Sequence, residues 1–206
     1  MAQNMNLTTG IALSTPSIRK DANKNTLRVL DAAKKVFAKN GLNTTVEDVA
    51  KEANVGVGTI YRRFKNKYHL ATAVSMDIFS EIYEEQNKIS LTNHPADTKL
   101  ELIFDYFTMA SRRYGKIHDM SLQLMNSKEI GDDLQQLVTS NMKKIFLKVI
   151  IQGQKEGLFR EGDPEVFQIL MFNMVNPYVV YQIKQRIPMS DIPSYLSQMI
   201  LKGLSR

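Results

Sequence analysis

Residues 44–67 read TTVEDVAKEANVGVGTIYRRFKNK, and this stretch decides how the rest of the chain is interpreted. Its apolar spacing predicts two short amphipathic helices, at 45–53 and 57–64. The residues between them, Asn54-Val55-Gly56, are typical of a tight turn. Two short helices joined in this way form a helix-turn-helix unit, whose second helix enters the major groove of DNA.

The first of these helices has two possible capping boxes. Thr44 and Glu47 have the required spacing, and so do Thr45 and Asp48 with a shorter acid. We therefore expect a hydroxyl side chain to begin the helix, without deciding between the two pairs.

The second helix has two unlike faces. Ile60 and Phe64 share one face and are interpreted as core. On the other face, arginine suits guanine edges or phosphate, threonine offers a hydroxyl and a methyl, valine suits a thymine methyl, and glycine allows close backbone approach. Side chains at the starts of the neighbouring helices suit phosphate contacts. The candidate DNA-binding residues are Thr44, Thr45, Val57, Gly58, Thr59, Tyr61, Arg62, Arg63 and Lys67.

Positive charge is concentrated in the same part of the chain. Residues 1–70 hold 12 Lys and Arg against 5 Asp and Glu, whereas residues 71–206 hold 15 against 16. A basic segment beside a nearly neutral one indicates a polyanion-binding module joined to a second module. A basic surface that only promotes solubility is the alternative.

Helical periodicity continues on both sides of this unit. A first helix is expected at 26–40 and ends at Gly41, and Asp163 and Pro164 are typical of a helix start. The other expected helices lie at 67–87, 98–114, 117–127, 131–156, 163–186 and 190–205, with a linker at 89–97 and a bend at Pro177. Residues 1–20 are expected to form a flexible arm. The sequence thus predicts an all-α protein of about nine helices.

The segments VLDAAKKVF (29–37), TTVEDVA (44–50) and VGVGTIYRRF (55–64), with Gly41 and Lys67, closely resemble the N-terminal domain of the TetR family of transcriptional regulators. The resemblance covers about residues 25–70. It implies a three-helix DNA-binding domain at 21–70, a linking fourth helix, and a ligand-binding and dimerisation domain at 71–206. It also implies base contacts at Val57, Gly58, Thr59 and Arg62, and phosphate contacts at Thr45, Tyr61, Arg63 and Lys67. Gly56 and the Arg62-Arg63 pair depart from the residues usual in the family, which leaves the operator sequence open.

The C-terminal part is rich in methionine and aromatic residues, which suit an adaptable apolar pocket. Residues 98–206 hold 8 of the 11 methionines. The candidate ligand-binding residues are Tyr106, Phe107, Met109, Met120, Met125, Met171, Met174 and Tyr178. A plain helical core is the alternative for each of them. The stretch 167–181 is apolar nearly all round, so we expect the last two helices to be buried between the domain and a second copy of the chain.

Several function classes have no support in the sequence. Without cysteine there is no disulfide or thiolate metal site, and no nucleophile–base pair or phosphate loop marks an enzyme. We expect no metal, no cofactor, no membrane span and a cytoplasmic location. The hypothesis is a homodimeric repressor that binds a palindromic operator and is released by a small, largely apolar effector. The rivals are a sequence-tolerant architectural DNA-binding protein without a ligand, and a helical binding or enzymatic domain.

Overall fold

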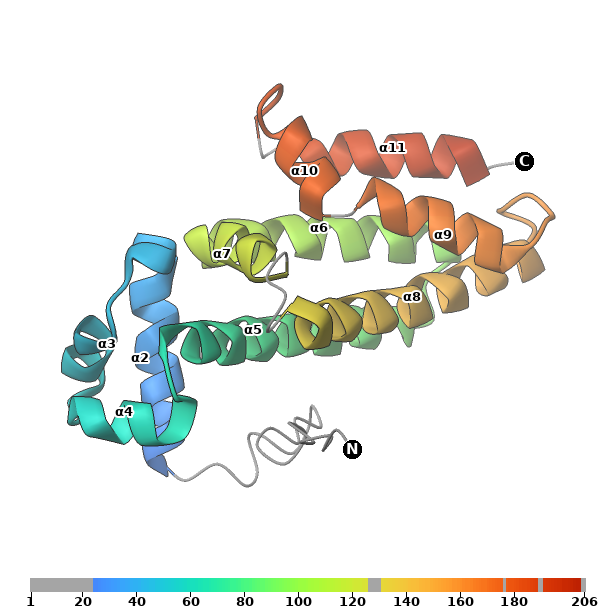
Figure 1. Ribbon diagram of the computed structural model, residues 1–206. Coiled ribbons are helices and arrows are strands. Elements are labelled where there is room, and N and C mark those ends of the chain that lie inside the picture. Colours follow the sequence, from blue (N-terminus) through green and yellow to red (C-terminus); the bar gives the residue numbers. More distant parts are fainter. Residues whose placement is uncertain (1–23, 126–130, 176, 189–190, 205–206) are drawn as a thin grey trace, which may run out of the picture.

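The computed structural model describes residues 24–125, 131–175, 177–188 and 191–204, and the regular elements in these ranges are helices (Figure 1). The all-α expectation is confirmed. The elements are α2 (Lys24–Asn40), the short 3₁₀ helix η2 (Gly41–Asn43), α3 (Val46–Ala53), α4 (Val57–Phe64), α5 (Lys67–Ser90), α6 (Ala96–Tyr114), α7 (Lys116–Met125), α8 (Gly131–Lys155), α9 (Pro164–Met174), α10 (Pro177–Ile183) and α11 (Ile192–Leu204). The arm expected at 1–20 lies outside the described residues.

Helix ends occur where local chemistry requires them. Gly41 follows α2 with a φ of 55°, and Asn54 ends α3 with a φ of 51°. Both values lie in the left-handed region, which glycine and asparagine adopt more easily than other residues. At α9, the Asp163 side chain accepts a hydrogen bond from the Glu165 N–H, and Pro164 takes the first helical position.

The expected helix at 163–186 is two helices. α9 ends at Met174 and α10 begins at Pro177, because a proline has no N–H to continue the ladder of helical hydrogen bonds. The described ranges therefore contain ten α-helices instead of about nine. The linker is also shorter than expected, since α5 extends to Ser90 and α6 begins at Ala96.

The chain is elongated, with α2, α3 and α4 at one end and α9, α10 and α11 stacked on one side of the other end (Figure 1). α5 leaves the first group and runs toward the other end, where it packs against α6 and α8. One apolar core joins α2, α3 and α4 to the first half of α5 and to α7, and it continues past residue 70 without a break. A second core joins α6, α8, α9 and α11. α5 is thus shared by the part expected to bind DNA and the part expected to bind a ligand.

No helix within the described ranges is both long enough and apolar enough to span a bilayer.

Candidate functional site

The start of α3 is capped by Thr45 and not by Thr44. The Thr45 hydroxyl accepts from the Asp48 N–H at 3.1 Å, and the Asp48 carboxylate accepts from the Thr45 N–H at 3.0 Å. The Thr45 side chain, followed by the hydrogen bond from the Thr45 N–H, lowers the pKa of the Asp48 carboxyl. Thr44 is fully buried, and its hydroxyl donates to the Val36 carbonyl at 3.4 Å. The expected phosphate contact of the Thr44 side chain is therefore wrong, because the hydroxyl faces the interior.

α4 turns its charged and phenolic side chains outward. Ile60 and Phe64 are buried, as expected, whereas Tyr61, Arg62 and Arg63 are exposed. A Cβ atom added at Gly58 would meet no atom within 4 Å, so the backbone there lies open to an approaching surface. This face has the size and chemistry to follow a DNA groove.

Two other candidates on α4 are less accessible. Val57 is half-buried and packs against the core of this end of the molecule, which leaves less of it for a thymine methyl. Thr59 is also half-buried and lines a hollow of about 260 Å³ between α4 and the start of α2. The hollow is lined by Asn25, Thr26, Val29, Thr59, Arg62, Arg63 and Phe64.

This hollow adds residues that sequence reasoning missed. Asn25 and Thr26 lie in the first turn of α2, where backbone N–H groups favour an anion, and they share the hollow with two arginines. The signal available in the sequence was polar residues at a helix start preceding an apolar run.

Lys67 is already engaged within the chain. Its ammonium donates to the Leu42 carbonyl at 2.7 Å and lies 5.7 Å from the centre of the Tyr68 ring. Asn66 caps α5 by accepting the His69 N–H at 3.0 Å. Lys67 thus joins α5 to the turn after α2, and a phosphate contact would use its remaining N–H groups.

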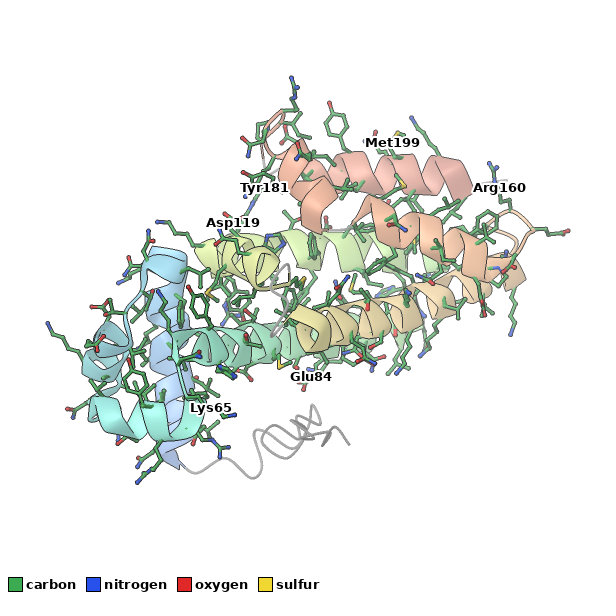
Figure 2. All side chains as sticks on the ribbon, in the orientation of Figure 1. Lys65, Glu84, Asp119, Arg160, Tyr181 and Met199 are labelled. Atoms are coloured by element: carbon green, nitrogen blue, oxygen red, sulfur yellow. The ribbon has the colours of Figure 1, made fainter. Side chains whose placement is uncertain are left out.

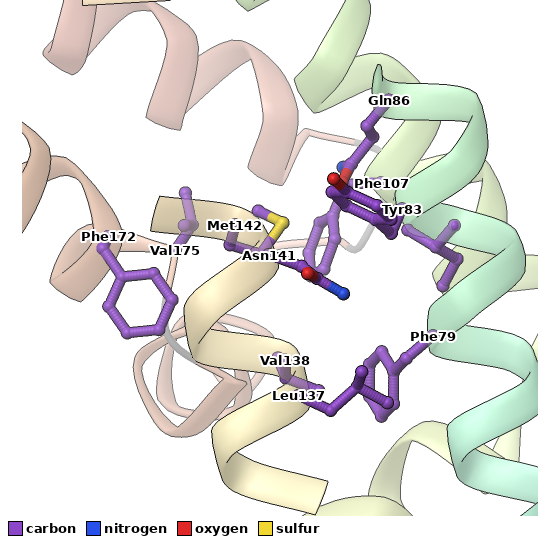
Figure 3. A pocket seen from close by; sticks show the side chains of 11 residues that line it. Phe79, Tyr83, Gln86, Phe107, Leu137, Val138, Asn141, Met142, Phe172 and Val175 are labelled. Carbon is purple, nitrogen blue, oxygen red and sulfur yellow. The ribbon is translucent and has the colours of Figure 1, made fainter. Parts of the chain in front are cut away.

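An apolar cavity of about 40 Å³ lies between α5, α6, α8 and α9 (Figure 3). It is lined by Phe79, Ile82, Tyr83, Gln86, Phe107, Leu137, Val138, Asn141, Met142, Phe172 and Val175. A second cavity of about 20 Å³ is lined by Ile78, Phe79, Ile82, Phe107, Ala110, Tyr114, Ile117, His118 and Ser121. Phe79, Ile82 and Phe107 line both cavities, so these three side chains form the partition between them.

The cavities involve few of the expected ligand-binding residues. Of the seven candidates whose side chains the structure describes, only Phe107 lines either cavity. Met109 is 54% exposed on α6, whereas Met120 and Met171 are buried in the two cores and line neither cavity. Tyr106, Met125 and Met174 are half-buried against the cores, and the side chain of Tyr178 lies outside what the structure describes. Methionine fills irregular gaps in any helical core, so its abundance did not locate a cavity.

Most residues that line the first cavity lie on α5 and α8. On α5 the residues Phe79, Ile82, Tyr83 and Gln86 recur at helical spacing and form one stripe. A glutamine inside an apolar stripe was the available signal, because a polar group on a buried face needs a reason to be there.

Ionic contacts join the cavity region to α2, in the part of the chain that is expected to bind DNA. Lys34 on α2 pairs with Asp77 on α5 at 2.5 Å and with Glu81 at 3.9 Å. The Tyr114 hydroxyl donates to the other Glu81 oxygen at 2.7 Å. Burial, followed by this bond to a carboxylate, raises the pKa of Tyr114. Because Tyr114 lines the second cavity, Glu81 contacts both a wall of that cavity and α2.

A second contact ties α7 to α10. Lys184 donates to the Asp119 carboxylate at 2.6 Å, and His118 Nδ1 lies 3.9 Å from the same oxygen. The adjacent His118 imidazole, together with the hydrogen bond from Lys184, lowers the pKa of Asp119 to about 2. In Figure 2, Asp119 lies on the side of α7 that faces α10.

The outer faces of the last helices are apolar and uncovered in a single chain. The large exposed apolar residues there are Val166, Ile169 and Leu170 on α9, Tyr181 on α10, and Tyr195 and Met199 on α11. Figure 2 shows Tyr181 and Met199 on this outer side. Asn173 on α9 is exposed in the single chain, and its amide donates to the Ile169 carbonyl at 2.8 Å.

Comparison with known proteins agrees with this geometry. Residues 29–74 match the family described as "Bacterial regulatory proteins, tetR family". An uncharacterised HTH-type transcriptional regulator of Bacillus subtilis, YhgD, is 29% identical over 185 residues, which are 86% of this chain and 95% of that protein. The fatty acid metabolism regulator protein of the same organism is 22% identical over 184 residues, covering 86% of this chain and 94% of its own length.

Solved structures show the same fold. The transcriptional regulator FadR of Bacillus subtilis, in complex with stearoyl-CoA, superposes with a TM-score of 0.69. It is 20% identical, and the match covers 87% of this chain and 99% of that one. The three-helix unit, the long α5 and the C-terminal helices thus form an arrangement that known regulators share.

Proposed function

We propose that this chain, a transcriptional regulator with the DNA-binding domain of the tetR family of bacterial regulatory proteins, is a repressor released by an effector. The observation that carries the proposal is that α5 contributes to both sites. Its first turn supports the DNA-binding face through Lys67, and its middle lines an apolar cavity through Phe79, Ile82 and Gln86. One uninterrupted helix therefore connects the two sites, so that a widening of the cavity that shifts α5 also displaces the face that carries α4.

DNA binding is assigned to the outward face of α4 and its neighbours. Tyr61, Arg62 and Arg63 are exposed side by side, and Thr45 is exposed at the start of α3. We add the first turn of α2, at Asn25 and Thr26, as a phosphate-binding position beside the two arginines. A cytoplasmic location follows from this role, because a bacterial repressor must reach the chromosome.

A homodimer is part of the proposal. The exposed apolar residues of α9 and α11, such as Leu170 and Met199, form a surface that a second copy of the chain would cover. The two α4 helices of a dimer would then read a palindromic operator, with half-sites about 34–36 Å apart or a close multiple of that spacing.

The effector is proposed to be a fatty acyl compound. The cavity walls are almost entirely apolar, and a regulator with the same fold holds stearoyl-CoA. Cavities of about 40 and 20 Å³ are far smaller than typical ligand pockets of roughly 300–1,000 Å³. The effector must therefore widen them by moving the partition that contains Phe107. That movement supplies the difference between two states that allosteric coupling requires.

The test has two stages. Purified protein is first used to select bound fragments from the genomic DNA of its source at near-physiological salt, where nonspecific binding is weak. Enrichment of one palindrome is expected, and retention without a shared sequence would favour the architectural alternative.

Octadecanoyl-CoA is then titrated onto the complex with the selected fragment. Release of the DNA is expected, with CoA alone as the control. DNA should in turn weaken binding of the acyl-CoA by the same factor, because equilibrium coupling is reciprocal. Equal acyl-CoA affinity with and without the operator would refute the release mechanism.

A further inference from the structure

Each of the two apolar cavities contains one buried polar atom without a hydrogen-bond partner in the part of the chain that the structure describes. These atoms are Oε1 of Gln86 in the first cavity and Nε2 of His118 in the second. A buried acceptor that is left unsatisfied destabilises the folded protein. Such atoms in an otherwise apolar wall therefore need an explanation.

The hydrogen bond made by its nitrogen determines the orientation of the Gln86 amide. Nε2 of this fully buried side chain donates to the Ile103 carbonyl at 3.5 Å, a long hydrogen bond. The opposite amide orientation would place two oxygens against each other, so Oε1 is the atom available to the cavity. Figure 3 shows the Gln86 amide extending from α5 into the cavity beside Phe107. Gln86 thus presents an acceptor in the cavity.

His118 also presents a buried polar atom without a partner. Its Nδ1 lies 3.9 Å from the Asp119 carboxylate, and Nε2, on the other side of the ring, has no hydrogen-bond partner among the described residues. Hydroxyl groups in the same wall are used elsewhere, because Tyr114 donates to Glu81 and Ser121 donates to the Ile117 carbonyl. The second cavity therefore also holds one polar atom without a hydrogen-bond partner among the described residues, whereas only Oε1 of Gln86 is by its chemistry an acceptor.

We propose that the effector is an acyl chain bearing an internal hydrogen-bond donor, a hydroxyl or an amide N–H, which Gln86 accepts. This inference rests on the proposed function and specifies its ligand. An unsubstituted chain would bury Oε1 against methylene groups and leave it unpaired, whereas a donor-bearing chain satisfies it. A site built to bond a polar group discriminates strongly against the analogue that lacks it. Gln86 is then a residue that determines effector specificity.

The test compares octadecanoyl-CoA with a series of monohydroxyoctadecanoyl-CoA compounds that differ in the position of the hydroxyl. Affinity is measured by titration calorimetry on the full chain. At least one hydroxylated member is expected to bind tenfold or more tightly than the unsubstituted chain. In the Gln86→Met variant, which keeps the side-chain length and removes the amide, this preference is expected to fall to within twofold. The exposed Gln136→Met on α8 is the matched control and should retain the preference.

A second measurement needs no ligand. If Oε1 of Gln86 is unsatisfied, Gln86→Met is expected to raise the Tm of the free protein, and a lowered Tm would contradict that premise. Equal affinity of the wild-type protein for every acyl chain, or an unchanged preference in Gln86→Met, would overturn the inference. If octadecanoyl-CoA releases the operator as well as any hydroxylated chain does, the inference fails while the proposed function stands. If no acyl chain binds, both the acyl assignment and the inference fail, and operator binding by the same preparation separately tests the DNA-binding part.

Discussion

The two ends of the molecule handle apolar surface in opposite ways. At the DNA-binding end, Phe37, Ile60 and Leu70 are buried in the first core, and the charged side chains of α4 face outward. Farther along α5, apolar side chains leave two cavities, the second of which is lined by residues of the same core, and an uncovered surface lies on α9 and α11. In the proposed function, a ligand and a second copy of the chain cover the apolar atoms of the second end, whereas the first end needs neither.

The largest effect on stability is expected from truncating a core side chain at the DNA-binding end. Phe37→Ala should lower the free energy of unfolding by about 3–5 kcal/mol, because the side chain is fully enclosed by neighbours that cannot fill its place. Phe79→Ala, at the edge of both cavities, should cost less, since the wall already lacks neighbours on one side. Urea unfolding of both variants measures the difference. Equal losses would show that the two ends are packed alike.

The next largest effect concerns DNA affinity. Arg62→Ala should weaken operator binding by about 1–3 kcal/mol and relax preference at one base position. Lys67→Ala should weaken binding to all sequences alike, and it should also destabilise the protein by about 1 kcal/mol, because the bond to the Leu42 carbonyl is lost. Binding to operator and scrambled DNA over a salt series, together with urea unfolding, separates the two. The same outcome for both variants would refute this division of roles.

A smaller effect should appear in the coupling between the two ends. Glu81→Gln keeps the shape of the side chain but weakens its contacts with Lys34 and with the Tyr114 hydroxyl. The factor by which octadecanoyl-CoA lowers operator affinity should change by about 0.5–2 kcal/mol, the range known for residues that link two sites. Glu84→Gln, an exposed neighbour on α5, is the control. An unchanged coupling factor would remove Glu81 from the connection.

Gly58→Ala sharpens the comparison by separating stability from binding. No atom lies within 4 Å of the added methyl group, so the protein should fold and gain up to about 1 kcal/mol from better helix propensity. Operator affinity should nevertheless fall, because the methyl group would occupy the space of the approaching DNA backbone or base. Unchanged affinity would place Gly58 outside the DNA contact.

The smallest effect is the pH dependence of the contact between α7 and α10. The folded-state pKa of Asp119 is about 2, below the ordinary value of 3.8, so its stabilising contribution is present above pH 3.8 and is lost as pH falls toward 2. The carboxylate is partly exposed, so solvent screening reduces the effect to a fraction of a kcal/mol. Unfolding of wild type and Asp119→Asn at pH 5 and pH 2.5 tests this. The difference between them should shrink at the lower pH.

The sequence predicted the DNA-binding end closely because its determinants are local. The α4 bounds agree with the expectation at both ends, and the turn at Asn54 and the break after Gly41 follow from single residues with special backbone preferences. Thr44 shows the limit of this reasoning. Two adjacent threonines had equivalent capping spacing, and only the path of the chain decided that Thr45 caps α3 while Thr44 enters the core.

Sequence by itself thus determined the helical class, most helix bounds and the outward arginines of α4, since helical periodicity and turn chemistry act over a few residues. Tertiary structure alone decided which residues surround a cavity. A cavity arises where side chains from α5, α6, α8 and α9 fail to fill the space between them, and that depends on how helices distant in sequence pack. Composition therefore pointed to methionines, whereas packing selected a stripe on α5 in which Gln86 is the polar exception.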